Sequence, residues 1–463
     1  MFSSLFRKKP VGPPSEFAHR TLTAFDLIFM GIGAIIGAGV FVLTGVGAAT
    51  AAGPGIVFSY AIAGTAALFA ALAYAELAAS VGGTGSAYSY AYAGFGEFAA
   101  WLIGWNLLLE YAMSVSTVAI GWAGYVNNLL QSMHINLPLV ITKNIFEGGF
   151  INLLAVFIVL ALGALLSLGV KQSARFNAVI VTIKLLTIAL FIIIASINID
   201  TDNWTPFLPF GWSGVMSGAA LVFFAYIGFD ALSTAVEDTI NPQRDIPIGI
   251  IVSLIVCTLI YIAVALLLTG IRHYTLLNVG SPVSDALLHI GYRTAAGITA
   301  AGAMAGLTTV ILIMYYGLTR VCLAMARDGL IPKQIAFINP RTHTPLRIII
   351  VVAIIMCLVS GFAPIDRAAE LVNIGTLAAF LFVCAGVMVF RSTHPDLKRP
   401  FKLPYNPLIP VLGILFCFYL MLNLPAITWF RFLIWTGIGV VIYFTYGKNH
   451  SLLQQQSKSE RER

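Results

Sequence analysis

The sequence predicts an all-α integral membrane protein with twelve transmembrane helices. The first observation behind this is composition, because 59% of the 463 residues are hydrophobic, only 10% are charged, and the mean hydropathy is +0.92. A water-soluble chain of this length needs far more charge to cover its surface. The second observation is that the apolar residues occur in long blocks. The third is that two of these blocks are interrupted near their middle.

The apolar blocks have the length of membrane-spanning helices. A helix needs roughly 20 apolar residues to cross the hydrocarbon core of a bilayer. Twelve blocks reach or approach that length, at 24–50, 55–80, 98–128, 150–168, 175–197, 212–236, 248–270, 295–326, 347–362, 369–390, 408–426 and 431–447. The connections are too short for a soluble domain. We therefore expect a cytoplasmic N-terminal segment at 1–23, one transmembrane domain at 24–447 and a disordered cytoplasmic tail at 448–463.

Lysine and arginine are distributed unevenly between alternate connections. With a cytoplasmic N-terminus, 20 of the 26 Lys and Arg residues lie on the cytoplasmic side and 5 lie outside. Cytoplasmic loops of membrane proteins carry such an excess, so both termini are expected in the cytoplasm and the protein in the plasma membrane. The net charge of +7 then indicates orientation and contact with anionic lipids rather than nucleic-acid binding. The oligomeric state stays open, and a monomer is plausible.

Two spans carry residues that interrupt a helix. The first has four glycines between Gly31 and Gly39, and each weakens a helix interior by about 1 kcal/mol relative to alanine. The sixth places Gly228 beside Asp230. Tight packing through small residues is the alternative interpretation. Interrupted spans at corresponding positions of two halves indicate a transporter binding site, and the spacing predicts a five-plus-five inverted repeat followed by two extra helices.

Interrupted helices offer the groups that an α-amino acid needs. A half-helix that begins in mid-membrane exposes N–H groups, which bind a carboxylate. A half-helix that ends there exposes carbonyls, which bind an ammonium group. Small residues such as Ala38 and Gly39 leave this backbone accessible. The two breaks therefore predict a receptor for a small charged or zwitterionic solute.

Lys184 lies in the middle of an apolar span, where a charge costs on the order of 2.5–3.5 kcal/mol on insertion scales. One interpretation is a lysine held by carbonyls for structure alone. The functional interpretation is a proton carrier, because buried lysines shift their pKa readily. In that case its ammonium group is expected to reach carbonyls near Gly31, Ile32 or Gly33.

Two carboxylates also lie within spans. Glu110 in the third span is either held by hydroxyls or a lysine, or forms a wall of the side-chain pocket that attracts a cationic substrate. Asp230 either caps or ties the second half of the sixth span, or takes part in substrate binding and proton coupling. The five cysteines form no CxxC pair, which argues against a disulfide scaffold or a cysteine metal site.

A series of motifs in a fixed order is highly specific. They are GIGAIIGAGVFVLTG (31–45), GPG (53–55), YAELA (74–78), GSAYSYAYA (85–93), SARFNAVIVTIKL (173–185), FFAYIGFDALSTAVED (223–238), NPQRDIPIGI (241–250), TRVCLAMARDGLIP (319–332) and PDLKRPFKLP (395–404). From about Leu22 to Gly447 the sequence resembles the amino acid–polyamine–organocation superfamily, and within it the bacterial cationic amino acid transporter-like group.

This resemblance implies a substrate site between spans one, three, six, eight and ten of a five-plus-five inverted repeat. It implies that the carboxylate binds N–H groups near Gly37, Ala38 and Gly39. It implies that the amine binds the carbonyls of Ile35, Phe224, Ala225 and Ile227. Phe224 would be the gating aromatic, Met314 would limit side-chain size unless it is an ordinary core residue, and Lys184 would act as a tethered cation in place of sodium. Family members often have a hydroxyl where Ala38 stands.

We therefore expect a proton-coupled symporter of α-amino acids that works by alternating access. Small neutral amino acids are favoured, and cationic ones are admissible but hindered. No cofactor and no metal are expected, only H⁺ as the coupling ion. A sodium-coupled symporter or an amino acid exchanger is the alternative. A channel would need a continuous polar pore and a membrane enzyme a clustered catalytic set, neither of which this sequence contains.

Overall fold

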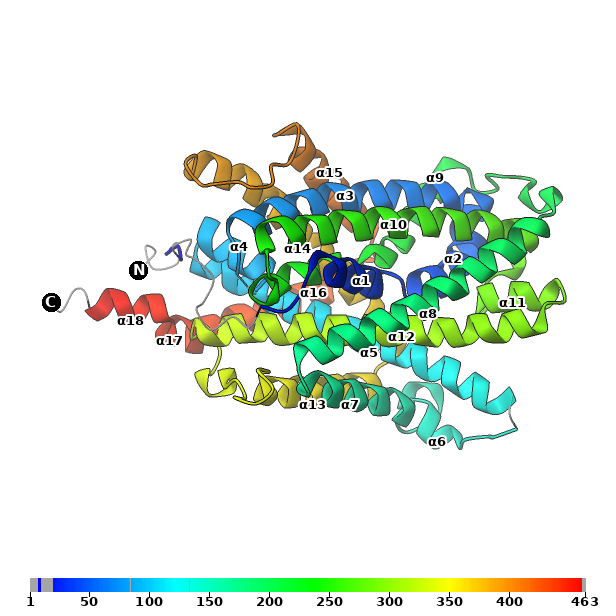
Figure 1. Cartoon of the computed structure of the whole chain (residues 1–463), viewed down its shortest axis with the longest axis horizontal. Helices are drawn as coiled ribbons and strands as arrows, with labels where there is room; N and C mark the ends of the chain where they lie inside the picture. Colours follow the sequence, from blue (N-terminus) through cyan, green and yellow to red (C-terminus); the bar gives the residue numbers. More distant parts are fainter. Residues whose placement is uncertain (1–6, 10–19, 84, 133, 460–463) are drawn as a thin grey trace.

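The computed structural model describes residues 7–9, 20–83, 85–132 and 134–459, and these residues form a bundle of helices (Figure 1). The helices of 12 residues or more are α1 (Ala24–Ile35), α3 (Ile56–Ser80), α5 (Glu97–Ser132), α7 (Leu153–Ser167), α8 (Val170–Ile197), α9 (Gly211–Val222), α10 (Pro242–Ile271), α12 (Arg293–Arg327), α13 (Leu346–Phe362), α14 (Ile365–Thr393), α15 (Leu408–Leu422) and α16 (Ala426–Ile442). The described ranges contain isolated bridges but no strand.

Short helical segments, which the hydropathy pattern did not distinguish, lie both in the connections and inside the predicted apolar blocks. The short α-helices are α2 (Thr44–Gly47), α4 (Ala87–Gly94), α6 (Leu139–Thr142), α11 (Pro282–His289), α17 (Lys448–His450) and α18 (Leu452–Ser459). The 3₁₀ and π segments are Gly39–Leu43, Ala48–Ala52, Gly53–Gly55, Ile145–Glu147, Thr201–Trp204, Phe223–Tyr226, Phe229–Asp238, Tyr274–Leu276, Lys333–Ala336 and Tyr443–Gly447. Such segments are too brief to give a hydropathy block of their own.

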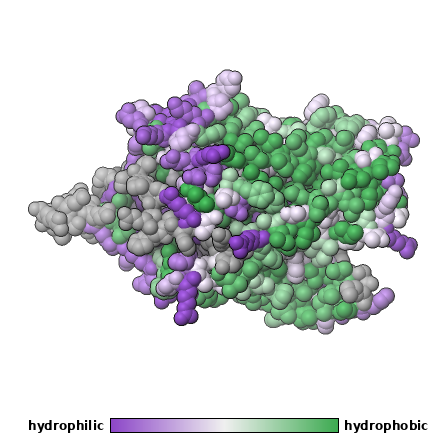
Figure 2. All heavy atoms as spheres, in the orientation of Figure 1, coloured by the Kyte–Doolittle hydropathy of each residue, from purple (hydrophilic) through white to green (hydrophobic). Residues whose placement is uncertain are grey.

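The apolar helices agree with a membrane protein. Among the described residues, 8 helical stretches are long and apolar enough to cross a bilayer, and the first of them, Ala24–Ser80, covers the first two predicted blocks. Three further apolar helices, α7, α13 and α15, are shorter. Hydrophobic residues cover most of the visible surface along the bundle, whereas hydrophilic residues gather at the end that bears the termini (Figure 2). This pattern is expected of a surface in contact with lipid.

Both described ends of the chain lie at one end of the bundle, called here the terminal end (Figure 1). The ammonium group of Lys9 is 2.6 Å from the carboxylate of Asp328, and the N–H of Leu452 donates to the Asp328 carbonyl at 3.0 Å. Within the expected tail, α17 and α18 are helical as far as Ser459, and Ser451 is buried against Glu97. Residues 1–6, 10–19 and 460–463 of the predicted terminal segments lie outside the described residues.

The interrupted first span occupies the centre of the bundle. α1 packs against α8, α10 and α12, and the 3₁₀ segment Phe229–Asp238 packs against α1, α10 and α12. α3 and α5 in turn cover α10 and α12 (Figure 1). The two interrupted spans are therefore enclosed by continuous helices, which supply the side chains that satisfy their broken backbone.

Candidate functional site

The first break lies where α1 ends at Ile35. Ile36 is extended, with φ −77° and ψ 103°, and the chain resumes a helical path at Ala38 before the π-helical segment Gly39–Leu43. An extended residue interrupts the ladder of backbone hydrogen bonds, so the last carbonyls of α1 need other partners. The cluster of glycines in the sequence does mark a break, as predicted.

The second break lies at Ile227 and Gly228. Ile227 is extended, and Gly228 has φ +122°, a conformation that residues with a side chain rarely adopt. A Cβ added to Gly228 would lie 2.8 Å from Met314 Cε and 3.0 Å from the Ala34 carbonyl oxygen. Gly228 is therefore required both for the turn and for the close approach of α1. The chain continues as the 3₁₀ segment Phe229–Asp238.

The two breaks lie directly against each other. A Cβ added to Gly39 would fall 2.2 Å from Ala225 Cβ and 2.5 Å from Ala225 Cα. The backbones of the two interrupted spans approach this closely because Gly39 has no side chain. Their broken ends consequently form one polar region, as a receptor built from both breaks requires.

Lys184 fills the carbonyl cluster of the first break. Its Nζ atom is 3.0, 3.2 and 2.9 Å from the carbonyl oxygens of Ile32, Gly33 and Ile36, and 3.0 Å from Thr309 Oγ1. The side chain is fully buried. Of the three expected carbonyls, those of Ile32 and Gly33 contact the ammonium group and that of Gly31 is not among its hydrogen-bond partners, whereas Ile36 and Thr309 are additional. The Ile32 carbonyl also accepts from the Ile36 N–H at 3.0 Å and the Gly33 carbonyl from Thr309 Oγ1 at 3.0 Å, so the ammonium group adds a cationic donor to carbonyls that converge at the end of α1.

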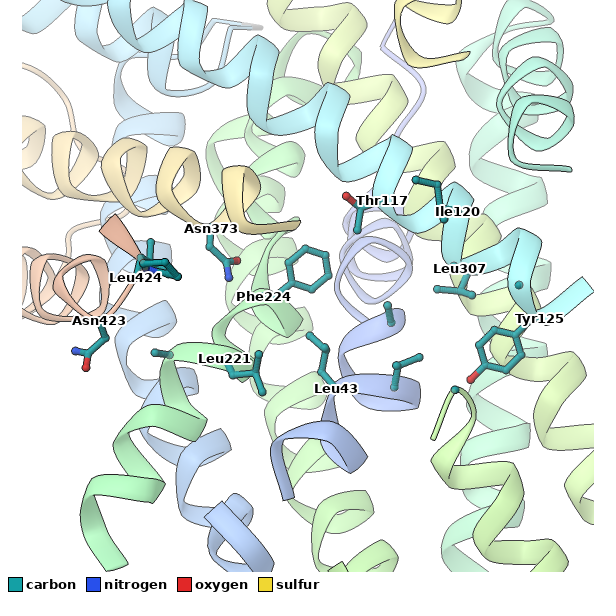
Figure 3. Close-up of a pocket in the computed structure, with 17 residues that line it drawn as sticks. Leu43, Thr117, Ile120, Tyr125, Leu221, Phe224, Leu307, Asn373, Asn423 and Leu424 are labelled. Carbon is teal, nitrogen blue, oxygen red and sulfur yellow. The ribbon is translucent and has the colours of Figure 1, made fainter. Parts of the chain in front are cut away.

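A cavity of about 730 Å³ lies beside the breaks. Its lining includes Gly280, after α10, and Asn423, Leu424 and Pro425, between α15 and α16, so it extends toward the end opposite the termini. In Figure 3 the ring of Phe224 lies between the side chains of Thr117 and Asn373, and all three residues line the cavity. Thr117, Asn373 and Asn423 are polar. The rest of the lining is mostly apolar and consists of Ala38, Val42, Leu43, Ile120, Gly121, Gly124, Tyr125, Ala220, Leu221, Phe224, Gly280, Leu307, Leu424 and Pro425.

The structure brings only part of the predicted site to this cavity. Ala38 and Phe224 line it. The other predicted backbone positions are buried behind its wall: Ile35, Gly37, Gly39, Ala225 and Ile227. Met314 and Glu110 are not among its lining residues and are almost completely buried, Met314 against the Gly228 turn and Glu110 beside Gly375. In this conformation neither is a wall of the cavity.

The two carboxylates lie in a buried polar region. Asp230 is fully buried and accepts a hydrogen bond from the hydroxyl of Tyr111. Its second oxygen, Oδ1, and both carboxylate oxygens of Glu110 have no hydrogen-bond partner among the described residues. The contact with Tyr111 ties the second half of the sixth span to α5, whereas the start of the 3₁₀ segment Phe229–Asp238 has no side-chain cap hydrogen bond. Glu110 is held by neither a lysine nor an arginine among the described residues.

Tyr261, Tyr60 and Thr309 were missed from the sequence although they contact the breaks. The hydroxyl of Tyr261 is 2.6 Å from the Ile35 carbonyl oxygen, and that of Tyr60 donates to the Gly39 carbonyl at 2.9 Å. Thr309 Oγ1 is within hydrogen-bond distance of Lys184. Tyrosine and threonine are common in membrane helices. A single residue of this kind in an apolar block gives no signal of what its hydroxyl contacts.

Comparisons with known proteins agree with this geometry. A family model described as amino acid permease matches residues 22–445. The chain is 46% identical over 460 residues to the methylthioribose transporter of Bacillus subtilis and 47% identical over 466 residues to its branched-chain amino acid permease BcaP, in each case covering 98% of this chain and 100% of the relative. It is 29% identical to the vacuolar cationic amino acid transporter 4 of Arabidopsis thaliana, over 97% of this chain and 96% of the relative.

Proposed function

The chain belongs to the amino acid permease family of transporters, and from this premise we propose that it is a proton-coupled symporter of α-amino acids with apolar side chains. The observation that carries the proposal is the position of the cavity, which lies against two interrupted helices and has a mostly apolar lining. The backbone of the breaks offers polar partners for the carboxylate and amine, and the cavity offers space for the side chain.

The side chain that suits the cavity is branched and apolar. Val42, Leu221 and Leu307 contribute aliphatic surface, and the Phe224 ring lies at its centre in Figure 3. Burying an aliphatic side chain against such a wall contributes about 1.5–3 kcal/mol. Glu110, the carboxylate expected to attract a cationic tail, is not in the wall. The relative named as a branched-chain permease supports the same choice. We therefore place leucine, isoleucine and valine ahead of alanine and arginine.

Coupling to protons is proposed to run through Lys184. When protonated, its ammonium group neutralises the carbonyls of Ile32, Gly33 and Ile36 and holds α1 in the conformation seen here. When it loses the proton, these carbonyls lose their cation and the first span can rearrange. A proton that binds the two conformations unequally shifts the equilibrium between them, which is what coupling requires. Glu110 and Asp230 are the alternative carriers, and sodium coupling or exchange is the alternative mechanism.

The proposed architecture is twelve membrane spans in a five-plus-five inverted repeat with two added helices, in the plasma membrane with both termini cytoplasmic. In that orientation the cavity faces outward. The excess of Lys and Arg on the terminal side supports this orientation. The position of the cavity, next to both interrupted spans, supports alternating access between repeats. No cofactor is proposed.

Uptake into proteoliposomes tests the function. With an imposed inward proton gradient and no sodium, leucine should accumulate above its equilibrium level and decay when the gradient is dissipated. Unlabelled isoleucine and valine should compete more strongly than alanine or arginine. N-acetyl-leucine and leucinamide should compete poorly, because each lacks one charged end of the zwitterion. Accumulation that requires sodium would instead favour the sodium-coupled mechanism.

A second candidate substrate is a thioether sugar of the methylthioribose kind, which is named for one relative. The observation that favours it is a pair of polar atoms at the cavity, Thr117 Oγ1 and Asn373 Oδ1, which have no hydrogen-bond partner among the described residues. Sugar hydroxyls would satisfy both. The same proteoliposomes decide between the candidates, since a sugar substrate would compete with leucine without a carboxylate or an amine.

A further inference from the structure

One tyrosine hydroxyl bridges the two interrupted spans. Tyr261 lies in α10 and is fully buried. Its hydroxyl oxygen is 2.6 Å from the carbonyl oxygen of Ile35, the last residue of α1, and 2.9 Å from that of Ala225 in the sixth span. A side chain of a third, continuous helix therefore holds together one carbonyl from each break.

This bridge leaves hydrogen-bonding capacity unused. A tyrosine hydroxyl has one proton and so donates to one of the two carbonyls at a time, whereas each carbonyl oxygen has two lone pairs. The carbonyls of Ile35 and Ala225 therefore converge on one point without being saturated. An ammonium group has three N–H donors, so one such group is able to bond two convergent carbonyl oxygens at once.

The carbonyl pair of Ile35 and Ala225 differs from the carbonyl cluster around Lys184 in the charge of the group that donates to it. The carbonyls of Ile32, Gly33 and Ile36 already face a cationic side chain, so a second cation there would be repelled. The carbonyls of Ile35 and Ala225 face a neutral hydroxyl and keep their negative potential. The breaks thus have one carbonyl cluster that already contacts a cation and one carbonyl pair that contacts only a neutral hydroxyl.

Neighbouring tyrosines hold the ring of Tyr261 in place. The ring centroids of Tyr60 and Tyr226 lie 5.2 and 5.4 Å from that of Tyr261. The Tyr60 hydroxyl donates to the Gly39 carbonyl at 2.9 Å, and the Tyr226 hydroxyl donates to the Tyr60 carbonyl at 2.8 Å. Side chains locked by packing and second hydrogen bonds are what a preorganised binding site requires.

We propose that Tyr261 is a positioning residue for the amine of the substrate. Its hydroxyl holds the carbonyls of Ile35 and Ala225 in the convergent arrangement that a primary ammonium group recognises, and its neutrality leaves that arrangement available to a cation. This inference rests on the proposed function, because it requires an α-amino acid substrate. It adds a determinant outside the two interrupted spans.

The test compares leucine with 2-hydroxy-4-methylpentanoate, which has the same carboxylate and side chain but a hydroxyl in place of the amine. Tyr261→Phe removes only the bridging hydroxyl. The matched control is Tyr315→Phe, because the Tyr315 hydroxyl is also buried and donates to a carbonyl, that of Ile349, at 2.7 Å. Inhibition constants against labelled leucine uptake and unfolding temperatures without ligand are measured for wild type and both variants.

Tyr261→Phe should raise the inhibition constant of leucine about tenfold, because the two carbonyls that bind the amine lose the hydroxyl that holds them together, and should leave the inhibition constant of the hydroxy acid unchanged. Tyr315→Phe should leave the ratio of the two constants at its wild-type value. An unchanged ratio in Tyr261→Phe, an equal loss of both ligands, or the absence of a cooperative unfolding transition would overturn the inference. If wild type transports no amino acid at all, the proposed function itself fails, which is a separate result.

Discussion

At the scale of single residues, Lys184 carries the strongest prediction. Lys184→Ala should abolish uphill leucine uptake driven by a proton gradient, because the carbonyls of Ile32, Gly33 and Ile36 lose the cation that they contact. A buried carbonyl left unsatisfied costs about 1–3 kcal/mol, so the unfolding temperature should fall as well. The measurement is accumulation in proteoliposomes, with leucine counterflow in the same vesicles as the control for a folded carrier.

Counterflow separates loss of coupling from loss of folding. A variant that retains counterflow but no longer accumulates leucine has lost only the coupling to protons. Full accumulation by Lys184→Ala would show that the proton binds elsewhere, and Glu110 and Asp230 would then be the next positions to substitute.

Gly228→Ala tests the turn of the second break. At φ +122° a residue with a side chain is strained, which costs on the order of 1–3 kcal/mol, and the new Cβ would lie 3.0 Å from the Ala34 carbonyl oxygen. Transport should be lost and the unfolding temperature should drop. Gly297→Ala is the control, because a Cβ at that position in α12 meets nothing within 4 Å. Wild-type transport in Gly228→Ala would contradict the proposed turn requirement.

At the scale of elements, α16 is fastened to α5 by a reciprocal pair of tryptophans. Trp105 Nε1 donates to the Trp435 carbonyl at 2.9 Å, Trp435 Nε1 donates to the Trp105 carbonyl at 3.2 Å, and the rings stack with centroids 4.4 Å apart. α16 contributes no residue to the cavity lining. α16 therefore contributes stability to the bundle from outside the cavity lining.

Trp435→Ala should consequently lower the unfolding temperature while the KM for leucine stays at the wild-type value. A fully buried tryptophan costs about 3–5 kcal/mol on truncation to alanine, and a smaller effect is expected here because Trp435 is only partly buried. The control is Phe430→Ala, since Phe430 lies on the same helix with 61% of its surface exposed. A raised KM in Trp435→Ala, with an unaltered unfolding temperature, would assign α16 to the substrate site instead.

At the scale of the whole molecule, the cavity extends away from the termini while polar contacts join the spans at the terminal end. Asp238, at the end of the sixth span, pairs with Arg320 of α12 at 2.7 Å and accepts from the Tyr316 hydroxyl at 2.5 Å. This pair is almost completely buried, whereas the pair of Lys9 with Asp328 leaves 49% of the lysine exposed.

Burial decides which of these ion pairs keeps the terminal end closed. Arg320→Gln should destabilise the closed arrangement strongly, because breaking a buried pair typically costs about 3–5 kcal/mol. Lys9→Ala should change little, because an exposed pair contributes about 0–1 kcal/mol. Hydrogen exchange of the segment Phe229–Asp238 should accelerate in Arg320→Gln and stay at the wild-type rate in Lys9→Ala. Equal rates in both variants would show that this end is held closed by packing alone.

The sequence by itself determined the membrane character, the helical class, the family and the location of both breaks. Each of these follows from short stretches of residues, since hydropathy is a sum over neighbouring positions and a glycine changes backbone freedom where it stands. Even the contact of Lys184 with the end of α1 was predictable, because a charge in an apolar span must find a polar partner and the break offers the nearest free carbonyls.

Only the tertiary structure decided which side chains surround the breaks and which positions line the cavity. Tyr261 and Thr309 carry no local signal, and their roles arise because α10 and α12 pack against α1. Met314 and Glu110 were expected in the wall, yet packing places both outside the cavity lining. Contacts between distant spans depend on how helices rotate and approach, and a conformation open to one end exposes only one set of them. A hydropathy pattern contains no information on how helices rotate and approach one another, nor on which conformation the molecule adopts.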